Sequence, residues 1–465
     1  MNPILQNKVN KFYLKFHFSR WPLYTSSSTG NINATSGSSS ISSSFSPVTL
    51  ITNHTESSFN VVDNDSPSAG ELMVTEDNLI APPSKSSIEN GDEDPFGSEC
   101  DIFDGEWVRD ENRKQYYPPG SCPFLGRHSF ECYKNGRPDD QYLQWQWQWP
   151  SVQINARCNN IPRILNGTDF LERLRGKKLV FVGDSLNYNM YASLSCILWN
   201  SIPDKNRVYP PPRNTEFKSR GDFSLIYEDY NCSIAFVWSA FLVYEFKKDR
   251  NRNVLKPERD VIRLDVIDKL ESSVYSDADV VIFDSFHWWV DGKTNNGVNY
   301  FQEGNYLHPK MEILKAYKKG LTTWRKWIDK NIDSNRTQVV FRGYSETHYV
   351  GGRWNTGGKC NLETEPIMSN ETYIQTSPMQ VKILEKTLQK MKTPVLYLNV
   401  SKLTYYRADA HPSVYAKNYT VQERIAALGH QDCSHWCLPG VPDTWNELLY
   451  ISLLKAGKGT FGSRN

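Results

Sequence analysis

A serine lies at the junction between a strand pattern and a helix pattern, where it could act as a nucleophile. Residues 178–182 form a short apolar run typical of a buried strand, and residues 186–199 carry apolar side chains at helical spacing. Ser185 stands between them in Gly183-Asp184-Ser185, where glycine allows a sharp turn and the helix N-terminus favours developing negative charge. The alternative is that Asp184 or Ser185 only caps the helix.

A nucleophilic serine needs a base, and the base needs a group that orients it. Asp432 and His435 are three residues apart, a spacing that can place a carboxylate and an imidazole on the same side of one turn. Cys433 and Cys437 bracket this pair, and disulfides at both would hold the loop rigidly. These features favour Asp432 and His435 as the partners of Ser185.

Other histidines are weaker candidates for the base. Asp409 and His411 form a second pair, but a spacing of two suits an extended segment less well. His287 and His348 have no carboxylate at such a spacing. We expect a structural role for each of these single histidines.

Alternating strand and helix patterns would position these residues. They predict an α/β fold with a parallel sheet and helices on both faces, and such sheets carry their active sites at the carboxyl ends of the strands. The strand patterns are 178–182, 279–283, 338–341 and 395–398, and the helix patterns are 186–199, 311–328 and 381–391.

Composition indicates a folded body behind a flexible stem. The chain has 465 residues, 13% of them aromatic, and a net charge of +1, which gives no electrostatic basis for nucleic-acid binding. Residues 25 to about 95 are rich in Ser, Thr, Asn and Gly, and residues 1–95 are predicted to be a disordered tail or stem. The sequence contains no run of about 18 apolar residues, the length needed to span a membrane. The N-terminus also lacks the apolar stretch of a signal peptide.

Nine cysteines are dispersed after residue 99. Their spacing does not match a zinc site, so we expect no metal. Dispersed cysteines favour disulfides in an oxidising compartment, with one thiol left over; the alternative is buried thiols in a cytosolic enzyme. Glycosylation sequons also favour the first interpretation and begin at Asn166, Asn231, Asn335, Asn370, Asn399 and Asn418.

Three tryptophans alternate with glutamines in 144–149 and would share one face of a strand. Trp145, Trp147 and Trp149 could form a platform for sugars, but we favour a buried strand face.

The chain resembles the plant trichome-birefringence-like family of cell-wall polysaccharide O-acetyltransferases from about residue 99 to the end. Many separate motifs occur in the order typical of that family. Besides the two motifs that hold Ser185 and His435, they are Phe103-Asp-Gly-Glu-Trp107, Cys132-Tyr-Lys-Asn-Gly-Arg137, Glu228-Asp-Tyr-Asn-Cys232, His287-Trp-Trp289, Phe341-Arg-Gly-Tyr-Ser345, Gly351-Gly-Arg-Trp-Asn-Thr-Gly-Gly-Lys-Cys360 and Ala410-His-Pro-Ser-Val-Tyr415.

This resemblance implies an SGNH-esterase-like α/β sandwich with a smaller cysteine-rich lobe. The stem would be followed by the cysteine-rich lobe at 96–164 and the catalytic domain at 165–465. Ser185 would be the nucleophile, His435 the general base and acid, and Asp432 the orienting carboxylate. Residues implied to contact the glycan are Trp288, Trp289, His348, Arg353 and Trp354.

The chain departs from the family pattern beside the nucleophile. Tyr188 stands where an arginine is usual, and Asp284 stands in place of an asparagine that can donate to the oxyanion. An ionised carboxylate cannot donate, so either Asn187 or Asn189 substitutes as the donor or the activity is reduced. The remaining residues expected around the oxyanion are Gly183, Asp184 and His287.

One set of disulfides is predicted, although spacing alone does not fix connectivity. Cys433 and Cys437 would pair with Cys360 and Cys132. The other pairs would be Cys100–Cys158 and Cys122–Cys196, leaving Cys232 free.

The expected function is transfer of acetyl from a donor, acetyl-CoA or another carrier, to a hydroxyl of xylan, mannan, xyloglucan or pectin, with no bound cofactor. A deacetylase using water as acceptor, or a non-catalytic protein that binds wall glycans, are the alternatives. The family resemblance implies a Golgi membrane protein of type II topology, although its anchor is not recognisable in this sequence.

Overall fold

The structure is a computed structural model, and it describes residues 100–125, 128–149, 158, 161–211, 223–246, 260–367 and 378–462. The predicted stem, residues 1–95, lies outside the described residues.

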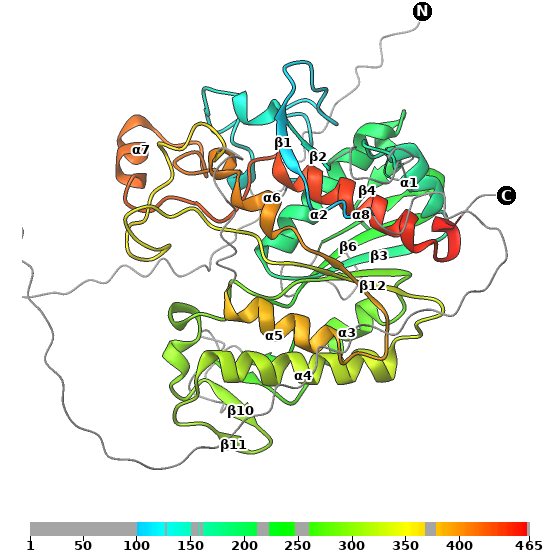
Figure 1. The fold of residues 1–465 in the computed structure, drawn as a ribbon, viewed down its shortest axis with the longest axis vertical. Helices are drawn as coiled ribbons and strands as arrows, with labels where there is room; N and C mark the ends of the chain where they lie inside the picture. The colour runs from blue at the N-terminus through cyan, green and yellow to red at the C-terminus, as the bar shows by residue number, and fades with distance from the viewer. Residues whose placement is uncertain are drawn as a thin grey trace, which may run out of the picture. The chain divides into compact units, whose positions relative to one another are not determined.

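A central sheet organises the described part of the chain (Figure 1). Five neighbouring strands run parallel, as predicted, whereas two strands at one edge are antiparallel. In sheet order the strands are β13 (Val395–Leu398), β12 (Gln338–Arg342), β9 (Val280–Phe283), β3 (Lys178–Gly183), β6 (Cys232–Trp238), β5 (Phe223–Tyr227) and β4 (Val208–Tyr209).

The antiparallel edge follows from a short connection. A single turn of 3₁₀ helix, η5 (Glu228–Tyr230), and Asn231 at φ 47° join β5 to β6. A connection this short makes a hairpin, whereas parallel neighbours need a crossover of a dozen or more residues. The four strands predicted from sequence, β3, β9, β12 and β13, are parallel as expected, and the antiparallel edge consists of β5 and β4, which had not been predicted.

Helices cover both faces of the central sheet, as predicted (Figure 1). Helix α2 packs against β3, α1 and α8 on one face, and α4 packs against α5 on the other. One layer contains α1 (Gly167–Arg173), α2 (Ser185–Ser201) and α8 (Val441–Ala456), and the other contains α3 (Lys269–Tyr275), α4 (Ile313–Asn331) and α5 (Met379–Leu388). Because both faces are covered, the inner strands are continuous apolar runs rather than alternating ones, and every residue of β9 is buried.

The cysteine-rich segment contains a two-stranded antiparallel sheet, β1 (Glu106–Arg109) and β2 (Trp145–Gln148). Trp147 and Trp149 are each 3% exposed, and the Nε1 of Trp147 donates to the carbonyl of Ile102. The buried interpretation is confirmed for these two indoles, and Trp145 is partly buried against the same core.

A second sheet lies outside the sandwich and had not been predicted. Its strands are β11 (Tyr306–Leu307), β10 (Phe301–Glu303), β8 (Val261–Arg263) and β7 (Glu245–Phe246) in sheet order. The C-terminal third adds α6 (Ser401–Tyr405) and α7 (Val421–Ala427). Short 3₁₀ helices are η1 (His128–Phe130), η2 (Gln141–Leu143), η4 (Lys205–Arg207), η6 (Asp291–Lys293), η7 (Asn295–Gly297), η8 (Ala408–Ala410) and η9 (Gly459–Phe461).

No helix among the described residues has the length and apolar character needed to cross a membrane.

Candidate active site

The candidate nucleophile is the first residue of α2, directly after strand β3. Asp184 is the N-cap, and its side chain accepts a hydrogen bond from the backbone N–H of Leu186 at 2.9 Å. A Cβ at position 183 would lie 1.7 Å from Oδ1 of Asp284, so the strand can end here only with glycine. This turn places the Ser185 hydroxyl at the carboxyl edge of the sheet, as the sequence predicted.

Three side chains separated by up to 250 residues meet at this edge. Nε2 of His435 lies 2.7 Å from Oγ of Ser185, and its Nδ1 lies 2.8 Å from Oδ2 of Asp432. Nucleophile, base and orienting carboxylate are thus in the hydrogen-bonded sequence that activates a serine.

Asp432 is held as a carboxylate. Its burial raises the pKa, but the charge of His435 and hydrogen bonds from His435 and from the backbone of Ser434 outweigh burial and lower the pKa to about 2. An ionised Asp432 keeps the proton of His435 on Nδ1 and leaves Nε2 to accept the proton of Ser185.

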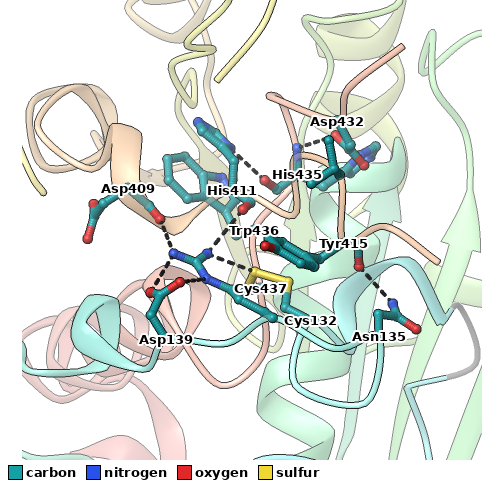
Figure 2. The surroundings of a disulfide bond; sticks show 12 residues. Cys132, Asn135, Asp139, Asp409, His411, Tyr415, Asp432, His435, Trp436 and Cys437 are labelled. Atoms are coloured by element: carbon teal, nitrogen blue, oxygen red, sulfur yellow. Dashed lines mark hydrogen bonds and ion pairs between the residues drawn. A yellow bond between two sulfur atoms is a disulfide. The ribbon is translucent and has the colours of Figure 1, made fainter. Parts of the chain in front are cut away.

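Two disulfides anchor the loop that carries His435, with the predicted pairing. Cys132–Cys437 ties it to the cysteine-rich segment across 305 residues, and Cys360–Cys433 ties it to a second loop. Figure 2 shows the first disulfide beside His411, Trp436 and the catalytic loop. Both cysteines that bracket His435 are thus fixed, as the sequence suggested.

The other cysteines also pair as predicted. Cys100 bonds to Cys158 and Cys122 to Cys196. Cys232 is a buried free thiol.

Aromatic packing supports the imidazole from the side. The ring of Phe130 lies 5.5 Å from the ring of His435 and 5.9 Å from that of Tyr188. Tyr188 is fully buried, and its hydroxyl donates to the carbonyl of Leu125. The residue that replaces the usual arginine is therefore part of the packing behind the triad.

The expectation that Asn187 or Asn189 donates to an oxyanion was wrong, because both amides donate elsewhere. Nδ2 of Asn187 donates to the carbonyls of Val182 and Ile282. Asn189 accepts from the backbone N–H of Trp436 at 2.8 Å and donates to its carbonyl, so it fastens α2 to the loop of His435.

Both carboxylate oxygens of Asp284 also have partners within the protein. Oδ1 accepts the backbone N–H of Asp184 at 2.9 Å, and Oδ2 forms an ion pair with Arg342, both side chains being inaccessible to solvent. Burial raises the pKa of Asp284, the nearby Asp184 adds to this, and Arg342 opposes it. Asp284 fixes the turn before the nucleophile. The backbone N–H of Ser185 lies in the first turn of α2, where amides have no partner within the helix, so it can donate to an oxyanion.

The second carboxylate–histidine pair is not formed. Both oxygens of Asp409 lie 2.9 Å from nitrogens of Arg407. His411 instead directs Nδ1 to the carbonyl of His435 and Nε2 to His348. Sequence spacing suggested a pair of Asp409 and His411, but the carboxylate of Asp409 pairs with the buried guanidinium of Arg407 instead.

His287 lies near the triad but is not aimed at Ser185. Its Nε2 lies 3.0 Å from the carbonyl of Ser345, and its ring stacks on Tyr344 at 5.0 Å. Burial lowers the pKa of His287 to about 4, with Arg342 and His435 acting in the same direction and Asp184 opposing them.

His287, which is partly buried and stays neutral, predicts an acid-sensitive fold. The unfolded chain takes up a proton on this residue between pH 6.5 and about 4 and the folded protein does not, so stability falls as pH drops through this window, by up to about 3 kcal/mol. His287→Gln keeps a donor for the Ser345 carbonyl but does not titrate, so its stability should fall less. Urea unfolding at several pH values in this window measures the difference. Equal acid sensitivity of the two proteins would contradict the assignment.

Two of the residues predicted to contact glycan are not available to do so. Trp289 is a core residue, 1% exposed, with its Nε1 bonded to Ser285, so its prediction as a glycan contact was wrong. His348 is also unsuited, because both of its ring nitrogens are engaged, one by His411 and one by the carbonyl of Tyr405.

Trp288 and Trp354 remain suited to contact a ligand. Trp288 packs edge-on against Trp238, which pairs with Gly183 across β3 and β6, so it lies at the same sheet edge as Ser185. Nζ of Lys293 lies 4.9 Å from the ring of Trp288 and 4.2 Å from that of Trp354. Trp354 is 41% exposed, and Arg353 beside it is exposed.

Several residues that build the site were not predicted, namely Arg342, Phe130, Trp436 and Ser345. Arg342 ends strand β12, and a charged residue ending an apolar strand pattern was a signal that could have suggested a partner at the sheet edge. The described residues contain no group of three or more side chains suited to bind a metal ion.

Comparison with known proteins agrees with this geometry. Residues 161–452 match the GDSL/SGNH-like acyl-esterase family found in Pmr5 and Cas1p, and residues 98–151 match the Pmr5 N-terminal domain.

The chain is also similar to curated proteins of Arabidopsis thaliana. It is 46% identical to protein trichome birefringence over 76% of this chain and 56% of the relative, and 45% identical to trichome birefringence-like 1 over 76% and 61%. It is 45% identical to trichome birefringence-like 4 over 76% of this chain and 75% of the relative. The chain thus spans 56–61% of the length of the first two of these relatives.

Proposed function

Because the chain belongs to the GDSL/SGNH-like acyl-esterase family and to its trichome birefringence-like members, we propose that it transfers acetyl groups to hydroxyls of a cell-wall polysaccharide through Ser185. The observation that carries the proposal is the 2.7 Å contact between Ser185 Oγ and His435 Nε2, with Asp432 on the far side of the ring.

The first half-reaction forms an acyl-enzyme. His435 Nε2 removes the proton of Ser185 as Oγ attacks the carbonyl carbon of the acetyl donor, and the protonated imidazole then gives that proton to the leaving group. The Ser185 N–H and the start of α2 stabilise the negative oxygen of the tetrahedral intermediate. Asp432 stabilises the imidazolium without taking its proton.

The second half-reaction passes acetyl to the acceptor. His435 removes the proton of a sugar hydroxyl, whose oxygen attacks the acetyl-Ser185 ester, and the proton returns to Oγ as Ser185 leaves. Water in place of the sugar would make the protein an esterase, so transfer requires that the glycan be positioned better than water. The donor is acetyl-CoA or another acetyl carrier, and the acceptor class is xylan, mannan, xyloglucan or pectin.

The proposal extends to an oxidising, lumenal compartment. Four disulfides, two of them on the loop of His435, support it because such bonds persist outside the reducing cytosol. The Golgi lumen, where wall polysaccharides would meet an acetyl donor, is the proposed location.

An acetyl-transfer assay tests the function. The full chain is incubated with acetyl donor and a panel of wall oligosaccharides, and products are read by mass spectrometry. Acetylated oligosaccharide, absent with Ser185→Ala, is the expected result. Loss of acetyl from acetylated oligosaccharides without any gain would make the protein an esterase. If acetyl is neither gained nor lost, only a glycan-binding role remains.

Substitution of Trp354 tests the acceptor site. A sugar stacked on this half-exposed indole would be worth about 1 kcal/mol, so Trp354→Ala should raise KM for the oligosaccharide about fivefold and leave hydrolysis of a small acetyl ester unchanged. The matched control is Trp199→Ala, since Trp199 is a partly buried indole packed on Phe124 near the far end of α2. An unchanged KM in Trp354→Ala would remove this residue from the acceptor site.

A further inference from the structure

Two imidazoles connect the backbone of the catalytic histidine to a neighbouring helix. Nδ1 of His411 lies 2.6 Å from the carbonyl oxygen of His435, a contact drawn in Figure 2. Nε2 of His411 lies 2.7 Å from Nδ1 of His348, whose Nε2 lies 2.8 Å from the carbonyl oxygen of Tyr405 at the end of α6. The His411 ring is 2% exposed and stacks on Trp436 at 4.2 Å.

These three contacts cannot all be hydrogen bonds if both rings are neutral. A carbonyl oxygen only accepts, so the outer nitrogens, Nε2 of His348 and Nδ1 of His411, must each carry a hydrogen. A neutral imidazole has one N–H, so the two inner nitrogens would then face each other with lone pairs across 2.7 Å. One further proton between them satisfies all three contacts.

We propose that His348 and His411 share one extra proton and are positioning residues for His435. With three protons on the pair, His411 holds the carbonyl of His435 and the catalytic loop stays in place. With two protons, one of the three contacts opens, and the position of the His435 ring is less tightly fixed. The proposal rests on the proposed function of Ser185 for its link to activity.

Charged groups of both signs face the pair, so the shared proton is retained only over part of the pH range. The negative charge of Asp409 acts on His348 and that of Asp432 on His411, and both favour the proton. Burial is the largest influence and lowers the pKa of both rings, and a protonated His435 acts in the same direction on His411. The cations that face this cluster are Arg137, which donates to the carbonyls of His411 and Asp409, and Arg407, which pairs with Asp409.

The pH dependence of kcat tests the proposal. On a chromogenic acetyl ester, kcat should fall as pH rises through the value at which the pair loses its proton. In His348→Asn the side-chain amide can donate to Nε2 of His411 without carrying charge, so this falling limb should disappear. His308→Asn is the matched control, because His308 pairs with Glu303 in the second sheet, and it should keep the wild-type profile. A falling limb that persists in His348→Asn, or none in the wild type, would overturn the proposal.

Replacement of His411 tests its hold on the loop. His411→Leu should lower kcat about 10- to 100-fold with little change in KM, because a small displacement of the base is costly. His411→Asn offers an amide near the position of Nδ1 and should recover part of the loss. Equal kcat values for His411→Leu and the wild type would contradict a positioning role.

A readout independent of activity separates this proposal from the proposed function. Ring nitrogens of the chain's nine histidines can be observed by ¹⁵N NMR and assigned with the His348 and His411 variants. Three protonated nitrogens on the pair on the acid side of its transition are expected, even if Ser185 proves inactive. Two protonated nitrogens throughout the stable pH range would overturn the shared proton, even if the enzyme is active.

Discussion

Ser185→Ala is expected to abolish acetyl transfer, with kcat reduced by at least about 10⁴-fold. The hydroxyl is the only group of the triad that can form the ester, so the loss should appear in kcat and leave binding of the oligosaccharide nearly unchanged. Single-turnover kinetics with a small acetyl ester, together with glycan binding by calorimetry, measure the two effects separately.

The control for this variant is Ser273→Ala. Ser273 lies on α3, is exposed, and bonds only to the carbonyl of Leu270 among the contacts described. It should retain wild-type rates. Substantial acetyl transfer by Ser185→Ala would show that another residue, or direct attack by the acceptor, carries the reaction.

Arg342→Leu is expected to lower the free energy of unfolding by about 3–5 kcal/mol. The guanidinium is inaccessible to solvent and forms an ion pair with Asp284, which in turn accepts the backbone N–H of Asp184 beside the nucleophile. Removing the cation leaves a buried carboxyl group without its partner at the turn that presents Ser185. Urea unfolding of the full chain measures the effect, and activity should fall with it.

Two further variants distinguish the effect of losing the buried Arg342–Asp284 ion pair from the effect of losing any arginine. Arg175→Leu removes a surface ion pair with Glu172, in which the arginine is 51% exposed, and should destabilise the protein far less than Arg342→Leu. Arg342→Leu combined with Asp284→Asn should recover part of the loss, since the amide oxygen can still accept from Asp184 and no charge is buried. If Arg342→Leu unfolds like the wild type, Asp284 does not depend on this ion pair.

Local patterns predicted much of the sheet and its helices. The run at 178–182 became β3, and the helix pattern from residue 186 became α2, because an inner parallel strand is buried on both faces and its apolar run is unambiguous. The triad was also predictable, since strand, turn and helix fix where Ser185 emerges, and the flanking cysteines indicated a loop held in place around His435.

Tertiary partners were not predictable in the same way. Nothing local to Asp284 indicates that Arg342, 58 residues away, would bond to it. Neighbouring Trp288 and Trp289 have the same residue type but different environments, partly buried and fully buried. The second sheet was missed because its strands are only two or three residues long, too short for a period-2 pattern.

The most direct test of the account is to trap the acyl-enzyme. The full chain is mixed with acetyl donor in the absence of acceptor, quenched in acid and digested, and the peptide containing Ser185 is analysed by mass spectrometry. We predict one added acetyl group on Ser185, lost when oligosaccharide is added before the quench and absent from His435→Ala. An unmodified Ser185 peptide under conditions in which the oligosaccharide does become acetylated would contradict the proposed mechanism.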